Sequence, residues 1–503
     1  MIKSILISLL LVAWFTQIQG QGSLRGSNLM EYQLGNIPEL DPRYQSSLYD
    51  QLNLSYRFKS FGLNTRVEQY YPSFGEDLDY IRISQFKFQY KSDFIDISIG
   101  HLYESFGKGL LLRTYEIPSS IWETRGYRVR YGFYKDLLGA AVQLKFKNTE
   151  LKLLRGEILD VTLPPTIEGE IDRRPDLIEG MELSQRFGRQ KMGAIYMRHH
   201  RTDPSSLDAD PDGYLSIYYD GNVLDNYSIY GEVSKRVTGE VDISDFGEAA
   251  AFGAYLGLNF YFGNLGGSVE YKNYQNFALG NGINDPPTLV KEHSYRLLNR
   301  STHVPTLTDE SGYQLELYYS FENGNMLTFN TARAKNEISE TDIPIFYEYF
   351  LEYQFQINES IDSRLFVDYS QAPFDNENHR YAVGSYWTFP HEKMSSSLEV
   401  EYQNIQRGDN DAFANYYFSY TLARPSLFSI SAVMELSADP FVLVQADDEF
   451  NFYPALVTTY KPNNKNTLTL FAGKRRGGPA CNSGVCYDVL SFQGVELRIT
   501  TRF

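Results

Sequence analysis

Three carboxylates near the middle of the chain have a spacing that could bind a hard cation. Asp208, Asp210 and Asp212 alternate with other residues and precede Gly213, as in the first half of a calcium-binding loop. The match ends there, because the twelfth position of such a loop is Tyr219 rather than a glutamate. Asp and Gly also form ordinary polar loops. A calcium ion that stiffens this loop and a loop without metal therefore both remain open.

The two cysteines, Cys481 and Cys486, lie close together near the C-terminus. In an exported protein such a pair is most simply a disulfide. Two thiols without nearby histidines are too few for structural zinc, which takes four ligands. We therefore predict a disulfide that fixes the shape of a short loop.

The histidines do not form a catalytic pattern. A serine hydrolase needs a histidine beside a serine and a third polar group that orients the ring, and no spacing marks such a set. His199 and His200 are consecutive, so on a strand they point to opposite faces and cannot bind one metal. We expect no catalytic residue, no enzyme activity and no cofactor other than the calcium considered above.

Apolar and polar residues alternate along most of the chain, which predicts strands with one apolar and one polar face. Short turns join these segments into hairpins, such as 252–262 with 266–274, and Tyr127–Tyr134 with Ala140–Phe146. Six charged residues on polar faces are predicted to line an aqueous interior and weakly favour cations: Glu270, Lys272, Glu316, Asp368, Glu399 and Glu401.

The first twenty residues predict export. Lys3 precedes the apolar run Ile5–Phe15, and the small residue Gly20 offers a cleavage point, as in a secretory signal peptide over residues 1–20. An uncleaved anchor is the alternative. Beyond this segment no apolar run approaches the ~20 residues of a membrane helix. The net charge of −17 argues against a nucleic-acid partner, whose phosphates require a basic surface.

The last segment, Val489–Phe503, alternates sharply and ends on an aromatic ring. With the export signal and the hairpins, it predicts an all-β transmembrane antiparallel barrel of about 24 strands, within a range of 20–28. Residues 21–503 then form one domain, which Val489–Phe503 closes against the N-terminal strand. A soluble exported β protein is the alternative. Aromatic residues make up 15% of the chain, which suits the interface girdles of such a barrel.

The connections alternate in length, as expected for short periplasmic turns and long extracellular loops. The predicted long loops are 158–176, 201–212, 237–248, 276–310, 371–379, 437–449 and 475–488. The segment 105–125 does not fit a plain hairpin, and an inward fold that constricts the lumen is one path open to it.

The expected partners follow from this placement. They are outer-membrane lipid and lipopolysaccharide, the barrel-assembly machinery that would read Phe503 as an assembly signal, and a protein docked on the long loops. The basic run 474–476 could contact lipopolysaccharide phosphate or an acidic partner, and a solvated loop base is the alternative.

Two stretches carry a resemblance to a known family. The C-terminal run GGPACNSGVCYDVLSFQGVELRITTRF and the segment Phe106–Tyr115 with Arg125-Gly126 resemble an uncharacterised outer-membrane barrel family of Bacteroidota. The resemblance implies a bacterial outer-membrane location and no assigned activity, and it transfers no ligand or catalytic residue. The leading hypothesis is a pore or gated conduit for solutes or polymers. The alternative is a non-conducting accessory barrel that docks a secretion, assembly or surface complex through its extracellular loops.

Overall fold

The structure is a computed structural model. It describes residues 22–36, 45–72, 79–124, 128–159, 173–201, 211–237, 251–280, 283–303, 309–336, 343–358, 360–373, 376–440, 450–482 and 485–503. The predicted signal peptide (residues 1–20) lies outside this range, as do Asp208 and Asp210. Among the described residues, no helix has the length and apolar character needed to cross a bilayer.

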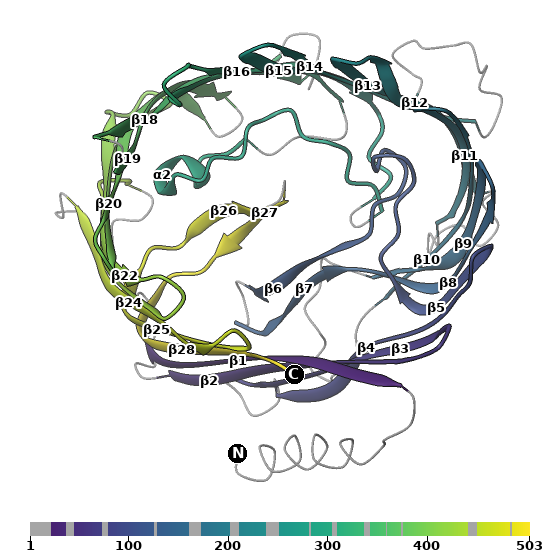
Figure 1. Cartoon of the computed structure of the whole chain (residues 1–503), viewed down its shortest axis with the longest axis horizontal. Helices are drawn as coiled ribbons and strands as arrows, with labels where there is room; N and C mark the ends of the chain where they lie inside the picture. Colours follow the sequence, from purple (N-terminus) through teal and green to yellow (C-terminus); the bar gives the residue numbers. More distant parts are fainter. Residues whose placement is uncertain are drawn as a thin grey trace.

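Twenty-four antiparallel strands form one sheet that closes into a barrel (Figure 1). The first strand, β1 (Ser23–Asn36), pairs with β2 (Gln45–Phe58) on one side and with the last strand, β28 (Phe492–Arg502), on the other. The predicted fold class, strand number and closing strand are therefore confirmed. Closure leaves no sheet edge with unpaired backbone groups, which is the requirement for a sheet in lipid.

The remaining wall strands follow in chain order. They are β3 (Phe61–Tyr71), β4 (Tyr80–Lys91), β5 (Ile95–Leu102), β8 (Leu137–Phe146), β9 (Thr149–Leu159), β10 (Arg173–Phe187), β11 (Gln190–His200), β12 (Asp212–Leu224), β13 (Tyr227–Arg236), β14 (Phe252–Phe262), β15 (Leu265–Gln275), β16 (Asp309–Ser320), β17 (Met326–Asn336), β18 (Ile345–Ile357), β19 (Ile361–Ala372), β20 (Glu377–Pro390), β21 (Ser395–Arg407), β22 (Phe413–Arg424), β23 (Phe428–Ser437), β24 (Asn451–Asn463) and β25 (Asn466–Arg475).

Over most of the barrel wall, large apolar side chains are exposed on the outside and charged side chains are buried on the inside. The inner face beside the luminal segments also carries buried apolar residues, such as Ile178 and Met197. On β19, Val367 is 51% exposed, whereas its neighbour Asp368 is 5% exposed. Large exposed apolar residues recur at alternate positions around the wall, as at Val383 and Leu351. A soluble protein keeps such exposed apolar area small. The wall therefore has the polarity of a barrel that faces lipid outside and polar groups inside.

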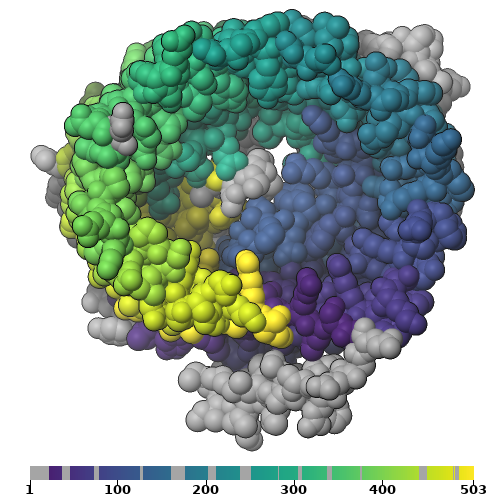
Figure 2. All heavy atoms as spheres, viewed as in Figure 1, coloured from purple at the N-terminus to yellow at the C-terminus, as the bar shows by residue number. Residues whose placement is uncertain are grey.

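The described residues of three segments leave the wall and lie inside the ring (Figure 1). The luminal hairpin (residues 103–136) contains β6 (Tyr115–Glu123) and β7 (Arg130–Lys135). The luminal insert (residues 276–308) contains the short helix α2 (Arg296–Asn299). The cysteine hairpin (residues 476–491) contains β26 (Gly478–Asn482) and β27 (Val485–Val489). Figure 2 shows their atoms filling most of the interior, with small gaps beside the wall. We call the three segments together the plug.

Two sequence predictions are wrong here. The sequence predicts extracellular loops at 276–310 and 475–488, but most of the described residues of each turn into the lumen (Figure 1). The luminal insert does so because its apolar side chains, including Leu279, Ile283 and Leu298, are at most 2% exposed. The predicted pairing of 127–134 with 140–146 also fails, because β7 pairs with β6 while β8 pairs with β5 and β9. Alternation marks a strand but does not choose its partner.

Each plug segment begins and ends beside paired wall residues. Leu102 is the register partner of Leu137, Gln275 that of Asp309, and Arg475 that of Phe492. The wall ladder therefore runs past the base of each segment without interruption. The plug is an addition to a sheet that is already closed.

Candidate functional site

The three plug segments hold one another. Arg113 of the luminal hairpin donates its backbone N–H to the Ile283 carbonyl of the luminal insert at 2.9 Å, and its guanidinium lies 3.1 Å from Asp285. Asn299 of the insert pairs with the Cys481 backbone in both directions, donating at 2.9 Å and accepting at 3.0 Å. Arg128 of the hairpin donates to the Ser491 carbonyl at 3.2 Å. The plug is therefore connected throughout.

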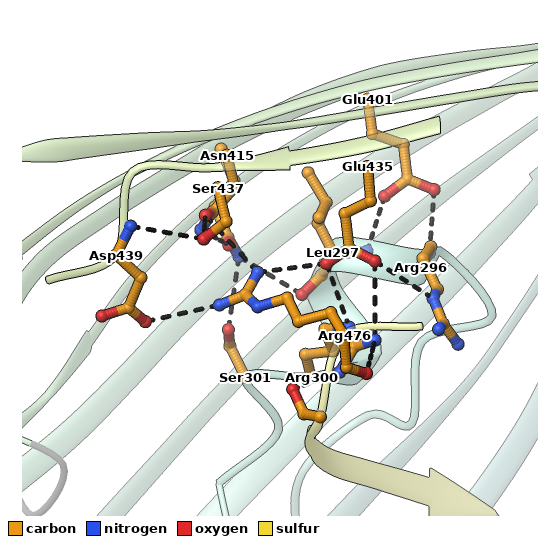
Figure 3. A network of polar contacts seen from close by, with 12 residues as sticks. Arg296, Leu297, Arg300, Ser301, Glu401, Asn415, Glu435, Ser437, Asp439 and Arg476 are labelled. Atoms are coloured by element: carbon orange, nitrogen blue, oxygen red, sulfur yellow. Dashed lines mark hydrogen bonds and ion pairs between the residues drawn. The ribbon is translucent and has the colours of Figure 1, made fainter. Parts of the chain in front are cut away.

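A wall carboxylate holds the start of α2. The two oxygens of Glu401, on β21, accept the backbone N–H groups of Arg296 and Leu297 at 2.8 and 2.7 Å (Figure 3). The first N–H groups of a helix have no partner within the helix, and a carboxylate also suits the positive end of the helix dipole. Four residues make a marginal helix in isolation, so this contact fixes the insert as well as attaching it to the wall.

Glu435, on β23, is the point where insert and cysteine hairpin meet the wall (Figure 3). Its carboxylate lies 3.1 Å from Arg476 of the cysteine hairpin, and 3.4 and 3.8 Å from Arg300 and Arg296 of the insert. Arg300 also donates to the Gly477 carbonyl at 3.2 Å. The side chains of Glu435 and Arg300 are 5% and 7% exposed, so this pair is largely removed from solvent screening, whereas Arg296 is 40% exposed.

The network extends along the wall through Asp439. Its carboxylate lies 3.3 Å from Arg476 and 2.9 Å from Arg407 of β21. Burial lowers the pKa of Arg300 to about 9, which still leaves its guanidinium charged at neutral pH. We call Glu435, Asp439, Arg296, Arg300 and Arg476 the latch.

The luminal hairpin has separate attachments to wall strands β1 and β3. Arg130 of β7 lies 2.5 Å from Glu31 of β1. The hydroxyl of Tyr70 donates to the Arg128 carbonyl at 2.8 Å, and Arg66 forms an ion pair with Glu116 of β6. These contacts join side chains, or a side chain and a backbone carbonyl, so the hairpin is not part of the wall ladder.

The six predicted lumen residues lie on the interior side of the wall. Four of them contact either a residue of the plug or an oppositely charged wall residue. Glu401 holds α2, Glu316 pairs with Lys291 of the insert, Lys272 pairs with Glu310, and Asp368 lies 3.4 Å from Arg380. Glu270 accepts from the Tyr255 hydroxyl at 2.7 Å, and Glu399 is half-buried. The cation preference expected from these residues stays a prediction.

The other predicted site residues are distributed around the barrel. Asp212 lies 3.3 Å from Arg201, and the calcium site stays a prediction because Asp208 and Asp210 are outside the described residues. Cys481 and Cys486 are opposite each other in the β26–β27 register. Phe503 lies at the β1–β28 seam, where it exchanges backbone hydrogen bonds of 2.9 and 3.0 Å with Gly26.

Sequence reasoning missed the latch. Arg476 was assigned to a basic run that could reach lipopolysaccharide, but its side chain is only 10% exposed and faces Glu435 and Asp439. One signal could have found the plug, namely the apolar residues within the supposed loop 276–310. A solvated loop has little reason to carry them.

A cavity of about 500 Å³ lies between the luminal hairpin and the wall strands β1 to β5, close to Phe503. Its charged lining consists of Arg25, Arg66, Lys87, Arg502 and the carboxylate of Glu116. Cationic side chains therefore outnumber acidic ones in this cavity, although the chain as a whole is acidic.

Comparison with solved structures finds similar barrels. The P pilus usher PapC translocation pore has a TM-score of 0.47 and 9% identity, over 96% of this chain and 99% of that one. An E. coli P pilus tip assembly intermediate, PapC-PapD-PapK-PapG, has a TM-score of 0.52 and 9% identity, over 95% of this chain and 60% of that one. The Pseudomonas aeruginosa outer membrane protein OpdK has a TM-score of 0.38 and 12% identity, over 76% and 98%. At these identities the likeness concerns the fold alone.

No curated protein matches this sequence. A family model does match, over residues 1–503, and its description is a family of unknown function, DUF6029. The chain belongs to the DUF6029 family.

Proposed function

We propose that the protein is an integral barrel of the bacterial outer membrane that acts as a gated conduit for solutes or polymers, closed at rest by the plug. The observation that carries this proposal is the way the plug is attached. Each segment leaves and rejoins the wall at paired residues, and side-chain contacts hold it in the lumen. The plug can therefore move without breaking the wall ladder.

The support for a membrane location is the polarity of the wall, with exposed apolar residues outside and buried charges inside. Residues 1–20 would act as the signal peptide, the Cys481–Cys486 disulfide would stiffen the cysteine hairpin, and lipid and lipopolysaccharide would surround the barrel. Membrane fractionation and migration on a gel before and after boiling test this location. A protein that stays in the soluble fraction would contradict it.

The conduit is tested by single-channel recording in planar bilayers. The wild-type barrel should show low conductance with rare openings, because the plug fills most of the lumen (Figure 2). Variants that release the plug should open the pore.

The hypothesis of a non-conducting accessory barrel has less support than the conduit. Its motivation was the length of 276–310 and a rigid cysteine loop on the surface, and most of both segments is inside the ring (Figure 1). The usher similarity still suggests that a barrel of this fold can work with partner proteins, since that relative is solved as a PapC-PapD-PapK-PapG intermediate.

Phe503 offers a prediction about assembly. Its ring lies over Gly26, where an added Cβ would be 2.3 Å from the ring. Deleting Phe503 should lower the amount of barrel in the outer membrane several-fold, if the assembly machinery reads this residue. Quantitative blotting of membrane fractions measures the loss.

The Gly26→Val variant is the matched control, because it displaces the ring in the folded barrel but leaves Phe503 in the sequence. If the assembly machinery recognises Phe503, the Gly26→Val variant should reach near-normal levels in the membrane. An equal loss in both variants would assign the effect to packing at the seam, and normal levels after the deletion would rule out the assembly role.

A further inference from the structure

Three side chains with metal-binding atoms meet where the luminal insert contacts the wall. His293 comes from the insert, Glu348 from β18 and Asp368 from β19. Each offers one ligand atom, and these atoms lie within 4.8 Å of one another. All three side chains are at most 1% exposed. The site is therefore enclosed, and residues far apart in the sequence build it.

Arg380 of β20 contacts only one oxygen of each of the two carboxylates, Glu348 and Asp368. Its guanidinium lies 3.1 Å from Glu348 Oε1 and 3.4 Å from Asp368 Oδ1. Within the part of the chain that the structure describes, Glu348 Oε2 and Asp368 Oδ2 are buried without a hydrogen-bond partner, and so are both ring nitrogens of His293. His293 Nε2 lies 3.2 Å from Glu348 Oε1, without hydrogen-bond geometry.

Buried polar atoms without partners are costly, and a carboxylate oxygen more so than a neutral group. One cation among the three side chains would satisfy one oxygen of each carboxylate and one ring nitrogen of His293. Two ligands of a tetrahedral Zn²⁺ with bonds of 2.0–2.1 Å are about 3.3 Å apart, and one ligand atom from each of the three side chains lies within 4.8 Å of the others. Arg380 would then orient both carboxylates by holding their other oxygens.

The charges also favour a divalent ion. Glu348 and Asp368 carry two negative charges, of which Arg380 balances one. A divalent cation would convert the remaining negative charge to a single positive charge. A third carboxylate, Glu377, lies 3.9 Å from Arg380 and 3.2 Å from Arg407. One imidazole and two carboxylates suit a first-row transition ion better than calcium, which prefers oxygen ligands alone.

We propose that His293, Glu348 and Asp368 bind a divalent transition-metal ion, with Zn²⁺ as the best fit, which ties the luminal insert to the wall. Metal binding does not depend on whether the barrel conducts, so its test is separate from that of the conduit.

A companion site on the same insert provides the control. His303 stacks on Phe346 of β18, with ring centroids 4.5 Å apart, and lies 3.7 Å from Glu310. His293 packs against Phe350 of the same strand, also with ring centroids 4.5 Å apart but with the rings tilted by 44°. The two histidines thus have similar surroundings. Glu310, however, forms an ion pair with Lys272, and His303 is not part of the three-residue group.

The experiment uses the full-length barrel in detergent, stripped with a chelator and titrated with Zn²⁺ by calorimetry. Co²⁺ absorption reports the coordination geometry. We expect one saturable site, weakened about 100-fold or more in His293→Gln and Asp368→Asn and unchanged in His303→Gln. Heat-modifiable migration selects the variants that are folded. The proposal is overturned if the wild type lacks a saturable site, if folded His293→Gln binds normally, or if His303→Gln alone abolishes binding.

Discussion

Replacing all three plug segments by short turns should turn a barrel of low conductance into a wide and permanently open pore. The replacements remove 103–136, 276–308 and 476–491, and join the wall strands through two-residue Asn-Gly turns. Each pair of flanking residues is already in register, as Gln275 is with Asp309. The wall should therefore still close, because no strand loses a neighbour.

The expected gain follows from barrel size. Barrels of 16–18 strands already enclose an aqueous channel, and this one has 24 strands. The conductance of an empty lumen of that width should be at least about tenfold higher than that of the plugged one, because its open cross-section is much larger. Single-channel recording in planar bilayers measures the change, and heat-modifiable migration shows whether the wall is intact.

Single and double replacements form the matched series. The segments contact one another through Arg113, Asn299 and Arg128. We therefore expect the conductance gained on removing two segments together to exceed the sum of the gains from removing each one alone. A folded triple variant that conducts no better than wild type would refute the conduit hypothesis. It would leave a barrel whose interior serves another purpose.

The barrel could be predicted from the sequence because its pattern is local. Alternation identified Val489–Phe503 as the closing strand, and the β1–β28 ladder has Leu497 opposite Tyr32 at that seam. Strand number followed from counting alternating segments. These features depend only on which side of a strand each residue occupies.

The plug could not be predicted in the same way, because it depends on contacts between distant residues. Glu435 and Arg300 are 135 positions apart, and Asn299 and Cys481 are 182 apart. A long connection that faces water and one that fills a lumen can share polarity and length. The apolar residues of 276–310 are one signal that separates the two cases, but the charged partners that hold each segment in the lumen are not visible in a single sequence. The site of His293, Glu348 and Asp368 was missed for the same reason.

Removing one carboxylate of the latch should open the wild-type pore without deleting any segment. Glu435→Ala would leave Arg300 and Arg476 largely buried and without their common partner (Figure 3). Removing one member of a buried ion pair costs about 3–5 kcal/mol. The substitution destabilises the closed state, in which the two arginines are buried beside Glu435. It destabilises an open state less, because water can solvate the arginines there.

Since 1.4 kcal/mol is about a tenfold change in an equilibrium constant, the open population should rise on the order of a hundredfold. Open probability in planar bilayers measures it. Asp96→Ala is the control, because Asp96 pairs with Lys145 between two wall strands, at 2.6 Å, and does not involve the plug. That variant should leave gating unchanged.

A second variant separates the loss of attachment from general damage. Replacing Glu435, Arg300 and Arg476 together by leucine removes the buried charges along with their partner, and such replacements are often neutral or stabilising. The triple variant should therefore close again, at least in part, whereas a nonspecific defect would be worse in it than in Glu435→Ala. If Glu435→Ala and Asp96→Ala opened equally, the latch would not be what holds the plug, and the wall itself would be the flexible element.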